Sequence, residues 1–195
     1  MTNTRIELKE KKMNASLKTI QTLSRIAKVV SALVFVFSII GAIGSAVGLI
    51  GIVMIDVFGI SEESLSFILE LDKSFTVESG YYVTALALIY CIGNAIVSSV
   101  AKSYFQSELH HGTPFTARGA AELRRVSVFA IVVPIAVSFA QSIAIAGISL
   151  FVANTEMIMP YETDISIGIF LLILSVIFKY GADISEPKSN AQTGV

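Results

Sequence analysis

Long runs of apolar residues without charge place the strongest limit on how this chain folds. Residues 29–55, 81–101 and 126–153 contain no Asp, Glu, Lys or Arg. An α-helix rises about 1.5 Å per residue, so roughly 20 such residues cross the ~30 Å hydrocarbon core of a bilayer. Only 15% of the 195 residues are charged, against about 25% in soluble domains. The pattern predicts a membrane protein that crosses the bilayer several times.

A fourth span is predicted over residues 160–180. Its charge-free core, residues 165–178, is short for a span, but extension back to Pro160 supplies the length. Proline is tolerated at the first helical position, and acidic side chains such as Asp164 are favourable in the first turn. The expected fold is therefore an all-α bundle of four transmembrane helices. A cleaved signal peptide is the competing interpretation of the first run, which is longer than the usual 7–15 apolar residues.

The distribution of basic residues predicts the orientation. Residues 1–28, 102–125 and 179–195 hold thirteen of the fourteen Lys and Arg residues, and Lys73 is the exception. Basic residues concentrate in cytoplasmic loops, so both termini and the central loop are expected in the cytoplasm. The chain then divides into a basic amphipathic segment, a membrane domain and a short tail, at 1–28, 29–182 and 183–195.

The basic N-terminal segment has two interpretations. Apolar residues recur there at helical spacing, namely Met13, Leu17, Ile20 and Leu23. Such a helix, with lysines beside its apolar stripe, can rest on an anionic leaflet. It can equally prolong the first span, its cations serving only to set the topology.

The central loop combines turn residues with a helix start. Gly112 suits the end of the preceding helix, and Pro114 forces an extended backbone on Thr113. Thr116 is then expected to cap the helix that continues into the third span. This order of residues, with Phe115, reads His-His-Gly-Thr-Pro-Phe-Thr from His110 onward.

This loop resembles that of a bacterial family of small four-span membrane proteins catalogued as a domain of unknown function. The resemblance rests on the Gly-x-Pro-Phe-Thr stretch at 112–116, on Leu123-Arg124-Arg125 and on the ending at 178–181, Phe-Lys-Tyr-Gly. It implies a bacterial inner-membrane location and, because relatives are often encoded beside a helix-turn-helix regulator, a membrane partner in regulation. It implies no catalytic residue.

Three arginines of this loop are not needed for its turn. Arg118, Arg124 and Arg125 are expected at the cytoplasmic face, where they can contact anionic lipid headgroups or an acidic protein partner. For the two at the span boundary, a role in topology alone explains them equally well. The net charge of −1 provides no basic field for direct binding of nucleic acid.

Polar side chains within the predicted spans are few and neutral. Asn94 and Gln141 lie near the centres of spans two and three. They are expected to hydrogen-bond to each other and hold two helices together, and the alternative is that they bind a polar substrate. Gly41, Gly44, Ser45 and Gly48 form small-xxx-small pairs in span one, which favour close helix packing.

The sequence predicts no catalytic residue, cofactor or metal site. His110 and His111 are adjacent and would point about 100° apart on a helix, and Cys91 has no paired histidine in any span. We therefore expect a non-enzymatic membrane protein that acts through partners. The alternative is a subunit of a small-solute transporter or channel, which would form a homo-oligomer through the small residues of span one.

The uneven distribution of basic residues predicts the outcome of cysteine labelling in intact cells. Cysteines introduced near residues 10, 117 and 190 should be shielded from a membrane-impermeant thiol reagent, whereas those near 63 and 157 should react. Labelling at 117 without lysis would contradict the predicted orientation.

Overall fold

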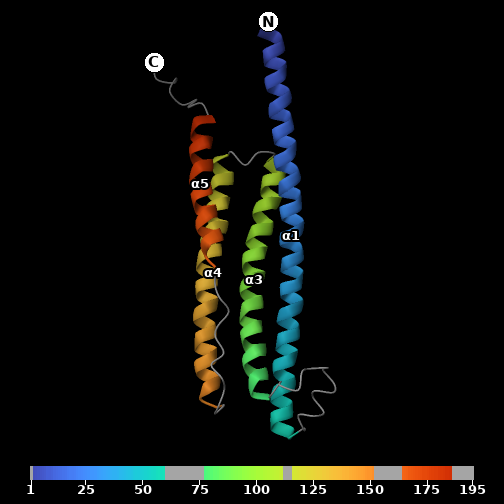
Figure 1. Ribbon diagram of the computed structural model, residues 1–195, viewed down its shortest axis with the longest axis vertical. Coiled ribbons are helices and arrows are strands. Elements are labelled where there is room, and N and C mark those ends of the chain that lie inside the picture. The colour runs from blue at the N-terminus through green and yellow to red at the C-terminus, as the bar shows by residue number, and fades with distance from the viewer. Residues whose placement is uncertain (1, 60–76, 112–115, 152–163, 186–195) are drawn as a thin grey trace, which may run out of the picture. The chain divides into compact units, whose positions relative to one another are not determined.

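The protein is all-α over the residues that the computed structural model describes, which are 2–59, 77–111, 116–151 and 164–185. Four helices occupy these ranges (Figure 1): α1 (Thr2–Phe58), α3 (Val77–His111), α4 (Ala117–Ser149) and α5 (Ser166–Ser185). Each of them contains a stretch long and apolar enough to cross a membrane. The expected class of fold, with four helices of membrane-spanning length, is confirmed.

Helix α1 contains the N-terminal basic segment from Thr2 onward. Its 57 residues form one unbroken helix from Thr2 to Phe58, about 85 Å long at 1.5 Å per residue. This length exceeds the ~30 Å hydrocarbon core, so a large part of α1 projects beyond it. The continuity favours the interpretation in which the N-terminal segment prolongs the first span.

Helix α5 begins later than the sequence pattern suggests. Its first residue is Ser166, and the carbonyl of Ile165 accepts the first helical hydrogen bond, from the backbone N–H of Ile169 at 3.1 Å. Asp164 precedes the helix and is exposed, so it is not in the first turn as expected. Pro160 lies outside the described residues.

The chain divides into two compact units, each built from parts of several helices. Unit 1 comprises residues 1–33, 97–131 and 165–195, and unit 2 comprises residues 34–96 and 132–164. Within unit 2, α1 and α3 pack in antiparallel directions through a stripe of small residues. A Cβ atom on Gly41 would lie 2.8 Å from Sγ of Cys91, and one on Gly48 would lie 3.2 Å from Cγ2 of Thr84.

Of the four small residues that the sequence suggests for close packing in α1, all but Gly44 lie on the face toward α3. Gly41, Ser45 and Gly48 follow one another at intervals of four and three, which places them on one face of the helix. Gly44 is exposed, and a Cβ atom there would meet nothing within 4 Å. The prediction that Gly44 packs closely is therefore wrong for the contacts of the described chain, because the residue lies off that face.

A second close contact in unit 2 joins α3 to α4. Gly93 is buried, and a Cβ atom on it would collide with the side chain of Val137 and lie 3.5 Å from Cγ1 of Val133. Without a hydrophobic driving force between helices in lipid, close backbone approach at small residues is what holds helices together. In unit 2, Gly41 thus marks the contact between α1 and α3, and Gly93 marks the contact between α3 and α4.

Unit 1 has its own apolar core. Tyr104 of α3 packs there with Leu123 and Val126 of α4, and α5 covers them with Leu171, Leu174 and Phe178. Figure 1 shows α5 alongside the first half of α4. Gly168 allows α5 to approach the backbone of α4 closely, since a Cβ atom there would lie 3.1 Å from the backbone oxygen of Ala130.

The outward faces of the helices are apolar in the described part of the chain. Phe37 of α1 is 68% exposed, Phe139 of α4 is 69% exposed and Phe170 of α5 is 63% exposed. Soluble monomers rarely expose contiguous apolar surfaces of this extent. These faces are suited to contact with lipid, which agrees with the high hydropathy of the helices.

Two glycines of α1, four residues apart, offer a matched test of the α1–α3 contact. Gly48→Leu should lower the midpoint of thermal unfolding in detergent, because the new side chain cannot fit beside Thr84, and overpacking costs about 1–3 kcal/mol. Gly44→Leu should leave the midpoint nearly unchanged because its surroundings are open. Equal losses for both variants would contradict the packing face assigned to α1.

Candidate functional site

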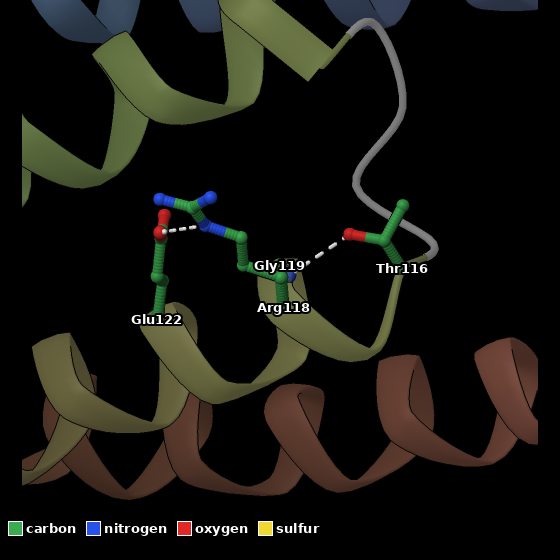
Figure 2. Close-up of polar contacts among 4 residues, drawn as sticks. All are labelled: Thr116, Arg118, Gly119 and Glu122. Carbon is green, nitrogen blue, oxygen red and sulfur yellow. Dashed lines mark hydrogen bonds and ion pairs between the residues drawn. The ribbon is translucent and has the colours of Figure 1, made fainter.

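The start of α4 is set by Thr116, as the sequence predicts. Figure 2 shows its hydroxyl oxygen accepting a hydrogen bond from the backbone N–H of Gly119 at 2.9 Å. The Thr116 carbonyl in turn accepts from the N–H of Ala120 at 3.0 Å. Both bonds are typical of a residue that caps a helix N-terminus. Residues 112–115, which carry the rest of the loop motif, lie outside the described residues.

The first of the three candidate arginines is paired within α4. The Nε atom of Arg118 lies 3.0 Å from Oε1 of Glu122, one helical turn further on (Figure 2). The side chain of Arg118 is 69% exposed and that of Glu122 is 29% exposed. Exposed pairs at this spacing contribute only about 0.3–0.5 kcal/mol. The pair nevertheless places a cation against the Glu122 carboxylate.

The second candidate, Arg125, lies on the same face of α4 as this ion pair and lines a cavity in unit 1. The cavity has a volume of about 260 Å³ and lies between α3 and α4. The guanidinium carbon of Arg125 is 5.9 Å from the centroid of the Phe129 ring, within the range of a cation–π contact. The walls contributed by α3 are Ser99, Val100, Ser103 and Tyr104, and those of α4 include Glu122 and Val126.

Behind the cavity, a polar cluster connects α3 to α1. Tyr104 is only 6% exposed, and Ser24 of α1 is 5% exposed. The half-buried carboxylate of Glu108 accepts hydrogen bonds from the hydroxyl groups of both residues. The Tyr104 ring also packs edge-on against Phe105, with centroids 5.1 Å apart. These contacts hold the Tyr104 wall of the cavity in place.

The third candidate, Arg124, is separate from the cavity. Its side chain is exposed, and a rotation of about 100° per residue places it on a different face from Arg125. Its backbone carbonyl accepts a hydrogen bond from the buried hydroxyl of Ser127 at 2.7 Å. The structure therefore does not bring the three arginines together: one is paired, one lines the cavity and one faces outward.

The intramembrane amides do not form the expected pair. In unit 2, Nε2 of the fully buried Gln141 donates to the backbone carbonyl of Leu86 at 3.2 Å. Asn94 lies eight residues along α3 from Leu86, or about 12 Å at 1.5 Å per residue. The predicted bond between Asn94 and Gln141 is therefore wrong, because the register of the two helices places Gln141 beside Leu86. The Oε1 atom of Gln141 has no hydrogen-bond partner in the described part of the chain.

The cavity in unit 1 is lined by groups that can bind a polar ligand. It combines the guanidinium of Arg125, the carboxylate of Glu122 and two serine hydroxyls with Tyr104 and apolar walls. No group of three potential metal ligands occurs among the described residues. Arg125 is a candidate from the sequence, whereas Ser103 and Glu122 are not, because a serine near a span end and a Glu-Arg pair at helical spacing also occur on ordinary solvated surfaces.

No family model, curated protein or solved structure matches this chain. The resemblance of the central loop to a four-span bacterial family thus stays a prediction from the sequence. The case for a function therefore rests on the geometry of the site.

The cap at Thr116 predicts a measurable loss of stability. Thr116→Ala should lower the free energy of unfolding by about 1 kcal/mol, because the N–H of Gly119 loses its acceptor. Thr116→Ser retains a hydroxyl and should behave as the wild type. Thermal or denaturant unfolding in detergent measures both, and an equal loss in the two variants would contradict a capping role.

Proposed function

We propose that this chain is a non-enzymatic protein of the bacterial inner membrane that acts through a cytoplasmic protein partner. Both termini and the start of α4 are placed in the cytoplasm on the basis of the thirteen basic residues that cluster in these segments. The partner then meets unit 1, which contains the start of α4.

The observation that carries this proposal is the exposed side chain of Arg124. It points away from the cavity wall, and no carboxylate lies within ion-pair distance of it among the described residues. Arg118, by contrast, already has Glu122 as its partner. An exposed arginine at the membrane surface is suited to an acidic surface of another protein, since guanidinium groups form directional bonds with carboxylates.

The position of Cys91 supports the proposal of a non-enzymatic protein. The Sγ atom of Cys91 occupies the space beside Gly41 in the contact between α1 and α3. A thiol that fills a contact between two helices serves their packing.

A transporter or channel subunit is the second candidate, and Gln141 is the observation that favours it. Its Oε1 atom is buried without a partner, and buried polar atoms are usually hydrogen-bonded. A polar solute that donates one hydrogen bond would satisfy this atom. The partner proposal is preferred because Gln141 already bonds to Leu86 through its other polar atom, as a structural amide does.

Site-specific photocrosslinking in intact cells tests the partner proposal. A photoreactive amino acid at position 124 should yield a crosslinked protein of defined mass, whereas one at position 128 should yield none, because Val128 is an exposed apolar residue one turn further into the span. The captured protein, once purified, should bind the wild type at least tenfold more tightly than Arg124→Glu. Lipid adducts alone at both positions would contradict the proposal.

A further inference from the structure

The charge balance of the cavity in unit 1 favours an anionic occupant. Its walls carry one carboxylate, Glu122, and one guanidinium, Arg125. The carboxylate is compensated by Arg118 at 3.0 Å. The Phe129 ring lies near the Arg125 guanidinium, at 5.9 Å, but an aromatic face does not neutralise it. Arg125 is therefore the uncompensated charge of the cavity.

Hydroxyl groups complete a set of donors on the opposite wall. Ser99 and Ser103 both line the cavity and are one helical turn apart on α3, which places them on the same face. Both serines are exposed in the structure, so their hydroxyls are accessible to a ligand. A guanidinium with neighbouring hydroxyls is a common donor set for phosphate oxygens.

The position of the cavity along the helices indicates where the ligand comes from. The apolar run of α3 ends at Ala101, before Lys102, and that of α4 begins at Val126, after Arg125. The cavity residues lie across both boundaries. This is the depth at which hydrocarbon gives way to lipid headgroups. An occupant at this depth has a polar group beside the arginine and an apolar part beyond it.

The dimensions of the cavity fit a headgroup and not a whole lipid. Its volume of about 260 Å³ is below the 300–1,000 Å³ that is typical of pockets for drug-sized ligands. Val100 and Val126 form apolar walls, and Phe129, one helical turn beyond Arg125 on the same face of α4, continues this apolar surface. Acyl chains can follow this apolar surface while the phosphate remains in the cavity.

We infer that the cavity between α3 and α4 binds the phosphodiester of a phospholipid headgroup, with Arg125 supplying the charge and Ser99 and Ser103 the hydrogen bonds. This site is independent of the proposed protein partner, which meets Arg124 on another face of α4. Failure of either proposal therefore leaves the other in place.

Native mass spectrometry of the full chain in an uncharged detergent tests the inference. Dioleoyl phosphatidylglycerol and dioleoyl phosphatidylethanolamine, which share the phosphodiester, should each give a one-to-one adduct. Dioleoylglycerol, which lacks it, should bind at least tenfold more weakly. Bound phospholipid should also raise the midpoint of thermal unfolding, as any ligand of the native state does.

Neighbouring residues provide matched variants. Arg125→Gln should weaken phospholipid binding at least tenfold, whereas Arg124→Gln, which removes the same charge outside the cavity, should change it less than twofold. Ser103→Phe fills the cavity from α3 and should also abolish the adduct, so the test remains valid if Arg125→Gln does not fold. Each variant is first checked for wild-type elution on size exclusion.

The remaining outcomes separate a specific site from general lipid contact. If inorganic phosphate at millimolar concentration displaces the lipid and stabilises the wild type but not Arg125→Gln, the phosphate site stands and free phosphate is a second source of its ligand. Equal binding of dioleoylglycerol would overturn the inference, as would equal losses for Arg124→Gln and Arg125→Gln.

Discussion

The need to satisfy every backbone hydrogen bond within the chain governs this molecule. In hydrocarbon no water replaces a missing partner, so each span must be helical. Helix α4 contains Pro134, which has no N–H and leaves the carbonyl four residues earlier, that of Ala130, without its usual donor. Gly168 of α5 approaches this carbonyl, and any Cβ atom there would lie 3.1 Å from the oxygen. Glycine at this position therefore lets α5 cover the weak point of α4.

Close approach at small residues takes the place of the hydrophobic effect that packs soluble helices. Lipid chains are as apolar as the side chains, so helices associate through van der Waals contact and a few polar bonds. Gly41 and Gly93 provide such contacts on opposite sides of α3 in unit 2. Unit 1 combines the contact at Gly168 with an aromatic and aliphatic core around Tyr104.

The two units differ in the polar groups that they contain. Unit 1 holds the paired Arg118 and Glu122, the carboxylate of Glu108 and the guanidinium of Arg125 beside a cavity. The buried interior of unit 2 is neutral among the described residues, with the amide of Gln141 bonded to a backbone carbonyl. Charge is costly within hydrocarbon, and the charged groups that line the cavity belong to unit 1.

The amino-acid sequence by itself determined the features that depend on one segment at a time. Hydropathy marks the spans, and the preference of threonine for a helix start places the cap at Thr116. Only the tertiary structure decided that Gly41 and not Gly44 faces α3, that Gln141 meets Leu86 instead of Asn94, and that Arg125 shares a cavity with Ser99. These pairings depend on how each helix is rotated about its axis and shifted along its neighbour. In a helix that is apolar on every face, the sequence has no periodic pattern that specifies this rotation.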